Sequence, residues 1–310
     1  MRIASFNVQS LRLRAKDGAA RLDGARDGDV PAHRGAAATA LDPLDRRLTA
    51  EVLHQAGADL IALQEVFDQA TLDHFHDHYL LQTGARPYPF RHCLPGNDGR
   101  GLDVAVMSRG PLRAVISHAE ATPDSLGFAP PEGVARDLPV FRRDCLLVEA
   151  GLLTLFICHF KAPYPVAETV WPVRRAEALA LRHLITARFG DPARGLWLIL
   201  GDLNEPRARP KGERAILPLT APFSVDLLER LPEAERWSWH EPFGLDYGRP
   251  DVMLASPALA RRWPGAQPQI LRGGLALEAR RYTGPRLRGV GAHRPHASDH
   301  AALVIDLPGA

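Results

Sequence analysis

The segment Gly201–Glu205, with the sequence GDLNE, carries the residue types best suited to chemistry. The apolar run Leu196–Leu200 precedes it and predicts a strand that delivers Asp202 and Asn204 to a turn. Side chains two positions apart on an extended chain point to the same face. This carboxylate and this amide can therefore hold one water or one phosphate oxygen. An Asx turn that merely ends a strand is the alternative interpretation.

A second acidic group follows an apolar run in LIALQEV, Leu60–Val66. A carboxylate at Glu65 is costly to bury unless it is paired or bound to a metal. Mg²⁺ takes oxygen ligands and often uses only one or two carboxylates, while waters and substrate phosphate complete its shell. Glu65 is therefore a candidate metal ligand, and a surface glutamate at a strand end is the alternative.

An Asp–His pair stands before the last apolar run, in SDHAAL at Ser298–Leu303. Asp299 can bind a metal or a water. His300 can polarise a phosphoryl oxygen or move a proton near neutral pH. A solvated loop histidine is the alternative, and the nearby His293 and His296 fit that alternative better.

The segment CHFKAP places His159 and Lys161 two residues apart at the end of another apolar run. Both side chains should face one side of the chain and could contact phosphate oxygens. Lys161 is one of only three lysines, with Lys16 and Lys211, so lysine is not a default residue in this chain. A capping histidine beside an exposed lysine is the alternative.

Two further residues stand beside predicted strands. Asn7, in SFNVQSL, could ligate a metal or hydrogen-bond to a carboxylate that does. Asp251 precedes the apolar stretch VMLAS and could fix the tautomer and orientation of a histidine. Asp246 is a rival for that role, although it does not directly adjoin an apolar run.

Arginines in two segments are candidate substrate-binding residues. Arg100 lies in the Gly-rich approach Gly96–Arg109, together with Asn97, Asp98 and Asp103, and Arg143 lies in an Arg-Arg-Asp run before a strand. Either guanidinium could bind phosphate. The alternative for both segments is that these residues only form turns.

These residues need a scaffold that brings strand ends together, and the apolar runs predict one. The predicted strands are Arg2–Phe6, Leu60–Leu63, Leu102–Met107, Leu146–Val148, Leu152–Cys158, Leu196–Leu200, Val252–Ala255 and Ala302–Ile305. The candidate side chains lie at or beside the ends of these strands, where a rigid sheet presents functional groups to a ligand.

Two helices are predicted between these strands. One begins at Asp42–Pro43, read as N-cap and first turn, and ends near Gly57, and the other runs over Val173–Phe189. The segment from about 11 to 41 and the segment Gly265–His296 are expected to be long loops. Helices and strands are interspersed without a linker or a repeat, so we expect one α/β domain over residues 1–310.

The composition is that of a globular domain, with 310 residues, 45% hydrophobic residues and a net charge of +2. Of the 38 basic residues, 3 are lysines and 35 are arginines, which suit bidentate phosphate contacts but also follow from a GC-rich genome. No signal peptide or membrane span is evident. The three single cysteines argue against a zinc finger or a disulfide scaffold and favour a cytoplasmic location.

Taken together, these motifs resemble the endonuclease/exonuclease/phosphatase superfamily, which includes deoxyribonuclease I, exonuclease III, neutral sphingomyelinases and inositol polyphosphate 5-phosphatases. The order is the superfamily's: Asn after the first strand, QE, HxK, GDxN, an Asp before an apolar strand, and a terminal SDH. The resemblance extends from Ile3 to about Ile305. It implies a four-layer α/β sandwich, in which two mixed sheets pack face to face with helices outside.

The resemblance also implies a metal site. Glu65 would be the main ligand, assisted by Asn7 and Asp299, and the expected cofactor is Mg²⁺ with Mn²⁺ as a substitute. The same resemblance assigns chemistry. Asp202 would activate or orient the attacking water, with Asn204 beside it.

His300, oriented by Asp251, would stabilise the charged phosphoryl group. His159 would stabilise the phosphate or assist the leaving group. The chain departs from the pattern where an aromatic residue commonly follows the Asp of PDVMLAS, and in its long segment after the first strand. A histidine at position 159 is closer to deoxyribonuclease I and the phospholipid-cleaving members than to apurinic endonucleases.

The expected function is Mg²⁺-dependent hydrolysis of a phosphate ester, foremost a nuclease-like phosphodiesterase acting on DNA or RNA by direct attack of water. No activated Ser or Cys nucleophile is recognisable, because strand alternation points Cys158 away from His159. A phosphomonoesterase, or a phosphodiesterase for phospholipids or small molecules, is the alternative for the same site. A catalytically inactive binding module is opposed by the intact Glu65, Asp202 and His300. The oligomeric state is left open.

Overall fold

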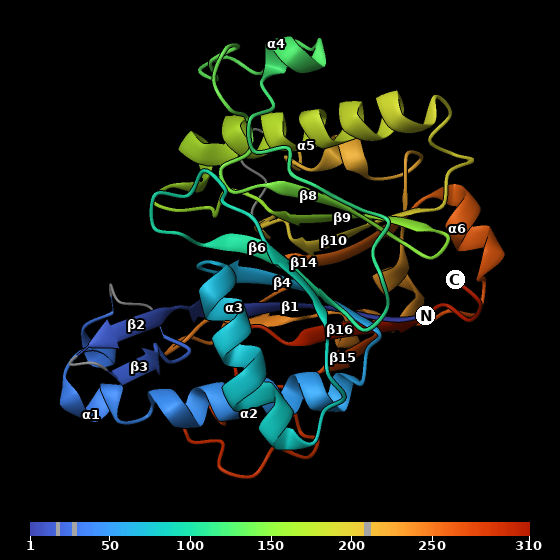
Figure 1. The fold of residues 1–310 in the computed structure, drawn as a ribbon. Helices are drawn as coiled ribbons and strands as arrows, with labels where there is room; N and C mark the ends of the chain where they lie inside the picture. The colour runs from blue at the N-terminus through green and yellow to red at the C-terminus, as the bar shows by residue number, and fades with distance from the viewer. Residues whose placement is uncertain (17–18, 27–29, 208–211) are drawn as a thin grey trace.

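The structure is a computed structural model that describes residues 1–16, 19–26, 30–207 and 212–310 (Figure 1). Two mixed sheets of six strands form its centre. The first sheet contains, in spatial order, β15 (Gln269–Leu271), β16 (Ala302–Asp306), β1 (Arg2–Leu11), β4 (Leu60–Val66), β6 (Asp103–Ser108) and β5 (Phe90–Cys93). Within it, β1 is parallel to β4 and antiparallel to β16.

The second sheet packs face to face on the first. In spatial order it contains β11 (Val225–Asp226), β14 (Asp251–Ala255), β10 (Trp197–Asp202), β9 (Leu153–His159), β8 (Cys145–Ala150) and β7 (Ala114–Ile116). Strands β9 and β10 are parallel, whereas β10 and β14 are antiparallel. Two short hairpins lie outside the sheets, β2 (Leu13–Lys16) with β3 (Ala19–Leu22), and β12 (Trp239–His240) with β13 (Tyr247–Gly248).

Helices cover the outer faces of the two sheets. Figure 1 shows α2 and α3 outside the first sheet and α5 outside the second, so the layers are helix, sheet, sheet, helix. The predicted four-layer sandwich is confirmed. The α-helices are α1 (Ala36–Thr39), α2 (Asp42–Ala56), α3 (Gln69–Phe75), α4 (Pro123–Leu126), α5 (Ala167–Phe189) and α6 (Pro257–Arg262). A π turn spans His76–Leu80, and 3-10 turns span Pro31–His33, Leu81–Thr83, Leu217–Leu219, Leu227–Arg230 and Glu233–Glu235.

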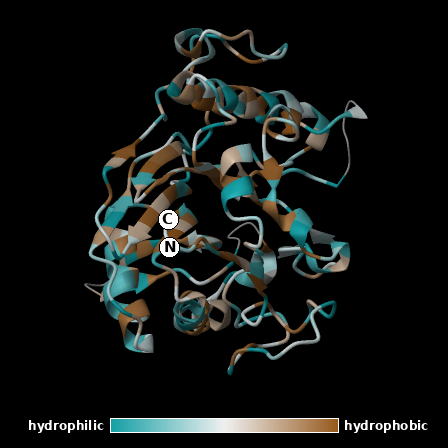
Figure 2. Cartoon of the chain, turned by 90° about the vertical axis from the view of Figure 1, so that its right-hand side faces the viewer, coloured by the Kyte–Doolittle hydropathy of each residue, from teal (hydrophilic) through white to brown (hydrophobic). Residues whose placement is uncertain are grey.

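Because side chains alternate along a strand, each central strand contributes residues to two hydrophobic cores, one on each face of its sheet. In β1, Ala4, Phe6 and Val8 pack on the helix side, whereas Ile3 packs between the sheets. Burial on both faces requires the nearly continuous apolar runs seen in the sequence. Figure 2 shows apolar stretches, coloured brown, along the strands of the sheets.

Helix α5 begins at Ala167, six residues before the predicted Val173. Proline in a helix interior removes a hydrogen bond, so Pro172 argues against a helix at this point. Burial of Val170 and Trp171 in the first turns offsets that loss. The prediction was therefore wrong at this end, while the helix stops before Gly190 as expected.

Helix α2 begins at Asp42 and ends where Gly57 takes a left-handed conformation, with φ 57°. The predicted N-cap role of Asp42 was wrong, because Leu41 holds the cap position and no side chain caps the helix. The Asp42 carboxylate instead accepts hydrogen bonds from Arg26 at 2.8 Å and from Arg294 at 2.9 Å. Tertiary ion pairing thus takes the place of local capping.

The two predicted loops contain regular structure. Strand β1 continues to Leu11, and the β2–β3 hairpin and α1 follow it, so the segment from about 11 to 41 contains regular elements that its prediction as a long loop did not include. Residues 17–18 and 27–29 of that segment lie outside the described residues. The edge strand β15 lies within the predicted Gly265–His296 loop and pairs with β16. Short strands of this kind depend on a partner strand, so local periodicity does not reveal them. In the described residues no helix has the length and apolar character needed to cross a membrane.

Candidate active site

Three predicted site residues form a row across the second sheet. The register pairs Asp202 of β10 with His159 of β9 on one side and with Asp251 of β14 on the other. On these strands Leu200, Ile157 and Met253 face the space between the sheets. Alternation therefore points all three polar side chains toward the first sheet, at the end of the shared core.

Gly201 permits this row to form. Its φ is 125°, and a Cβ built there would lie 2.0 Å from the carbonyl oxygen of Cys158 on the neighbouring strand. A side chain at this position would force β9 and β10 apart. Glycine is therefore required by the close approach that aligns His159 with Asp202.

Asn7 and Glu65 both lie on the first sheet, but the backbone directs their side chains to the site in different ways. Asn7 lies on the same face of β1 as Ile3, toward the second sheet. On β4, Ile61 and Leu63 point to the opposite, helix-covered side. Glu65 would point the same way if the strand alternated regularly. The register slips between Gln64 and Val66, and Glu65 has a left-handed φ of 68°. This irregularity turns the carboxylate toward the site.

The Asn7 amide joins the two sheets. Its Nδ2 donates to Asp202 Oδ2 at 3.1 Å and to Glu65 Oε1 at 3.3 Å, while its Oδ1 accepts from the Gln9 N–H at 3.0 Å. The amide nitrogen, and not the oxygen, faces the two carboxylates. Of the two roles predicted for Asn7, this geometry matches the one that orients a carboxylate.

His300 is held by the predicted partner. Its Nδ1 lies 2.9 Å from Asp251 Oδ2, which also accepts from Ser238 Oγ at 2.6 Å, and its Nε2 lies 3.8 Å from Asp202 Oδ2. Burial alone would lower the pKa of His300, but the carboxylates of Asp251, Asp299 and Asp202 raise it well above its ordinary value. The imidazole is therefore cationic at neutral pH. Asp246, the rival to Asp251, has no such contact among the described hydrogen bonds.

His159 lies opposite, in a different electrostatic setting. Its Nε2 is 3.6 Å from Asp202 Oδ2 and 3.9 Å from Glu65 Oε1. Burial, reinforced by the positive charges of Arg143 and His300, holds its pKa well below the ordinary value. The imidazole is therefore neutral. Its buried Nδ1 has no hydrogen-bond partner among the described residues.

Asp202 is the centre of the cluster. Its Oδ1 accepts from the Asn204 N–H at 2.8 Å, and the Asn204 amide donates to the carbonyl of Phe160 at 3.0 Å. Burial raises the pKa of Asp202 to about 7, and the nearby charges of Asp251 and Glu65 add to this effect while His300 opposes it. A carboxylate near this pKa can accept a proton at physiological pH.

Asp299 approaches from the start of β16, next to residues that sequence reasoning missed. Its Oδ2 accepts from the Trp239 indole N–H at 3.0 Å, and its Oδ1 lies 3.3 Å from Ser298 Oγ. Burial and the charge of Glu65 raise its pKa. No local pattern marks Trp239, because its role depends on the pairing of the β12 strand with His300.

The arginines predicted to bind substrate gather around Asp98. Arg143 is 3% exposed, lies 3.0 Å from Asp98 and donates to the Phe160 carbonyl at 2.8 Å, directly behind the His159 strand end. Arg100 is largely exposed and lies 3.1 Å from the same carboxylate. Arg100 is thus accessible to a ligand, whereas Arg143 supports the strand from within.

Lys161 is partly buried at the start of the loop after β9. Its Nζ donates to the carbonyl of Tyr164 at 2.8 Å. Burial lowers its pKa, and the positive charges of Arg143 and Arg100 add to this effect. The structure therefore places the two flanking cations, Lys161 and Arg100, on the same side of the site as His159.

Backbone strain is concentrated at this site. Of the five non-glycine residues with positive φ in the described residues, Gln9 (47°), Ser10 (55°), Glu65 (68°) and Asn204 (53°) lie in it. Such conformations persist only where the surrounding structure holds them, and they cluster at functional sites. The strain therefore marks the same place as the side chains.

The donor set suits a hard divalent cation. Four buried or partly buried carboxylates, Glu65, Asp202, Asp251 and Asp299, line this site, and oxygen donors are what Mg²⁺ and Mn²⁺ prefer. Within the described ranges no group of three or more His, Cys, Asp or Glu side chains converges as a metal cage. Mg²⁺ does not require one, since it keeps several waters and uses few carboxylates.

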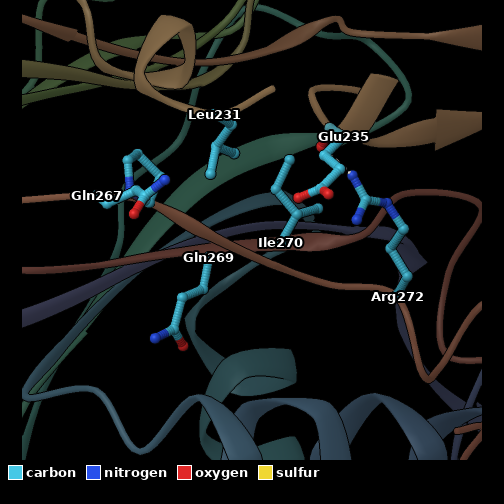
Figure 3. A pocket seen from close by; sticks show the side chains of 7 residues that line it. Leu231, Glu235, Gln267, Gln269, Ile270 and Arg272 are labelled. Carbon is cyan, nitrogen blue, oxygen red and sulfur yellow. Dashed lines mark hydrogen bonds between the residues drawn. The ribbon is translucent and has the colours of Figure 1, made fainter. Parts of the chain in front are cut away.

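A cavity of about 380 Å³ lies elsewhere, beside the edge strand β15. Figure 3 shows its lining, with Glu235 and Arg272 on one side and Leu231, Gln267, Gln269 and Ile270 around it. None of the residues singled out in the sequence lines this cavity. It is therefore separate from the carboxylate cluster.

Comparison with known proteins bears on the family and the fold. The sequence profile of the endonuclease/exonuclease/phosphatase family matches residues 4–300. Curated proteins give no match. Among solved structures, truncated Caenorhabditis elegans TDP2 is 16% identical with a TM-score of 0.56, and covers 98% of this chain and 96% of that one.

Two further structures share the fold. A humanized Danio rerio TDP2 is 15% identical, with a TM-score of 0.57 and coverage of 99% of both chains. A mannosyl-6-phosphatase from Bacteroides thetaiotaomicron is 13% identical, with a TM-score of 0.53 and coverage of 99% of this chain and 98% of that one. These similarities establish the fold, and the family profile spans nearly all of the sequence, so this chain belongs to the endonuclease/exonuclease/phosphatase family.

Proposed function

We propose that this chain is a phosphodiesterase that requires a divalent cation, foremost Mg²⁺, and cleaves its substrate by direct attack of water. One observation carries the proposal. Glu65 from the first sheet and Asp202 from the second are brought together by the Asn7 amide, with a cationic His300 and a neutral His159 on either side. Members of this family hydrolyse phosphate esters.

Glu65 would hold the cation together with Asp299, and the Asn7 amide nitrogen would orient the Glu65 carboxylate. When bound, the cation would neutralise charge on the phosphoryl oxygens. The Ser10 N–H supports Glu65 by donating to its Oε2 at 2.8 Å, and the Trp239 indole supports Asp299. These contacts orient the carboxylate oxygens that a cation would use.

Asp202 would orient the attacking water and accept its proton. The carboxylate is held by the backbone of Asn204 and by the Asn7 amide, so its position is defined before substrate binds. Asn204 would contact the same water or a phosphate oxygen. A base whose pKa lies near neutrality balances its charged population against its basicity.

The two histidines would have different roles because their charges differ. Cationic His300, oriented by Asp251, would stabilise the negative charge that develops on the phosphoryl group. Neutral His159 would donate a hydrogen bond to phosphate or to the departing oxygen. The buried carboxylate behind His300 raises its pKa, so the imidazolium would persist throughout catalysis.

Arg100 and Lys161 would contact substrate phosphate at the rim, with Arg143 acting mainly through the strand that carries His159. A nuclease-like activity on DNA or RNA is the foremost candidate. A phosphomonoesterase is the second candidate, because a mannosyl-6-phosphatase shares the fold over 98% of its chain. The described cysteines Cys93, Cys145 and Cys158 are free and buried, which supports a cytoplasmic location.

The decisive experiment offers purified protein with Mg²⁺ a panel of substrates. The panel contains plasmid DNA, single-stranded DNA, RNA, bis-p-nitrophenyl phosphate and several phosphate monoesters. Glu65→Gln and Asp202→Ala should abolish turnover, as should EDTA. Asp226→Asn removes a partly buried, ion-paired carboxylate outside the site and serves as the control that stays active.

Cleavage of nucleic acid that weakens steeply with salt would support the nuclease. Turnover of monoesters alone would move the assignment to the phosphatase. Activity that survives EDTA and the Glu65→Gln substitution would refute the metal-dependent mechanism. A phosphorylated enzyme intermediate would refute direct attack by water.

A further inference from the structure

A two-residue bulge at the end of β1 contacts both segments proposed to hold the cation. Gln9 and Ser10 adopt left-handed conformations, and the register between β1 and β4 shifts at this point. The Ser10 N–H donates to Glu65 Oε2 at 2.8 Å. The Gln9 side chain accepts from the Asp299 N–H at 3.2 Å. The shape of this bulge therefore determines where Glu65 and Asp299 lie.

Arg46, on the first turns of α2, holds the bulge from behind. Its side chain is fully buried, and its guanidinium donates to the carbonyls of Val8 and Gln9 at 2.6 Å each. It also donates to the carbonyls of Asp23 at 2.5 Å and Gly24 at 2.7 Å. One planar group thus binds four backbone oxygens from two segments. Left-handed backbone at non-glycine residues persists only where such contacts hold it.

Asp45, the preceding residue, holds the other side. Its Oδ1 accepts from the His296 N–H at 3.0 Å, three residues before Asp299, and its Oδ2 accepts from the Ala25 N–H at 3.0 Å. The same carboxylate pairs with Arg294. Consecutive residues of α2 therefore connect the β1 bulge to the loop that leads to Asp299.

We propose that Arg46, supported by Asp45, is a positioning residue for the cation site. Arg46 does not reach the reacting atoms. It fixes the carbonyls of Val8 and Gln9, which sets the Ser10 N–H and so the orientation of the Glu65 carboxylate. This inference rests on the proposed role of Glu65 as a cation ligand.

The test compares Arg46→Met and Arg46→Lys with the matched control Arg230→Met. Arg230 is also an arginine that binds backbone carbonyls, those of Ala260 and Trp263, but it lies in the α6 region away from the site. Two readouts are used. Calorimetric titration with Mg²⁺ alone measures cation affinity, and hydrogen–deuterium exchange of the peptide spanning residues 7–13 reports on the bulge in the absence of metal.

Arg46→Met should weaken Mg²⁺ binding by about 10- to 100-fold, the usual loss when a residue that orients a ligand is removed. Exchange in the 7–13 peptide should accelerate in the same variant. Arg46→Lys should show a smaller loss of both, because one ammonium cannot reach all four carbonyls. Arg230→Met should change neither readout. Should Arg46→Met fail to fold by circular dichroism, Arg46→Lys carries the comparison.

Wild-type Mg²⁺ affinity together with wild-type exchange in the folded Arg46 variant would overturn the proposal, as would an equal change in Arg230→Met. If the wild-type protein binds no Mg²⁺, the proposed function fails. Exchange in the 7–13 peptide then decides by itself whether Arg46 holds the bulge.

Discussion

Replacing Asp202 by asparagine should stabilise the metal-free protein while it destroys activity. Asp202 is buried, and its pKa is raised to about 7 from an ordinary value of 3.8. That difference corresponds to about 4 kcal/mol of destabilisation of the charged form above pH 7. Asparagine has nearly the same volume and no charge. The Asp202→Asn variant loses the charge-assisted hydrogen bond from Asn7, which lowers the free energy of unfolding by about 1–3 kcal/mol. The net increase in the free energy of unfolding at pH 8 should therefore be about 1–3 kcal/mol.

The pH dependence separates this effect from ordinary packing. Because the pKa of Asp202 is higher in the folded than in the unfolded state, the folded protein binds the proton more tightly. The contribution of this group to stability is therefore present at low pH and is lost as the pH rises from about 4 to about 7. The advantage of Asp202→Asn should be about 2 kcal/mol larger at pH 8 than at pH 5.5.

Urea denaturation in EDTA at both pH values measures this advantage. The exposed Asp137→Asn is the control and should leave the unfolding free energy unchanged. Saturating Mg²⁺ should stabilise the wild-type protein more than the variant, because the cation would stabilise the charged carboxylate. The reasoning is refuted if the advantage of Asp202→Asn does not grow between pH 5.5 and pH 8, or if the variant is the less stable protein at pH 8.

Three further outcomes are expected. Asp251→Asn should lower kcat by about 10²- to 10⁴-fold with the Mg²⁺ requirement unchanged, because His300 loses its orienting carboxylate. Steady-state kinetics over a Mg²⁺ series measures both quantities, and a shifted Mg²⁺ requirement would contradict this prediction. The pKa of His300 is raised, so its charge is retained at neutral pH and lost on the alkaline side; the rate should fall there, and a pH–rate profile unchanged in His300→Gln would contradict this. Gly201→Ala should lower the unfolding free energy by about 3 kcal/mol or more, because its Cβ would meet the Cys158 carbonyl; unchanged thermal stability would refute that clash.

Strand-based reasoning located much of the site in advance. The predicted strands appear with shifted ends, and Cys158 packs in the helix-side core, on the face opposite to His159, as strand alternation predicts. Asp251, which was preferred to Asp246 as the partner of a histidine, lies within hydrogen-bond distance of His300. These successes have one cause, because side-chain direction in a strand follows from residue number once the strand is known.

Other parts of the site depend on contacts between distant segments. Glu65 has the wrong parity to face Asp202 on a regular strand, and only its left-handed backbone corrects this. The indole of Trp239 reaches Asp299 across 60 positions of sequence. No local pattern encodes such contacts, since they exist only when the strands are paired.

The sequence by itself determined the family, the order of the motifs and the residue types that meet at the site. Local sequence suffices to identify these features, because carboxylates, amides and histidines can be recognised at the ends of apolar strands. Only the tertiary structure decided how these groups are held. Asn7 turns its amide nitrogen to the carboxylates, Arg143 is enclosed behind His159, and Arg46 binds the carbonyls of the bulge. These assignments follow from burial and from long-range hydrogen bonds, which require every buried polar group to find its partner in the folded chain.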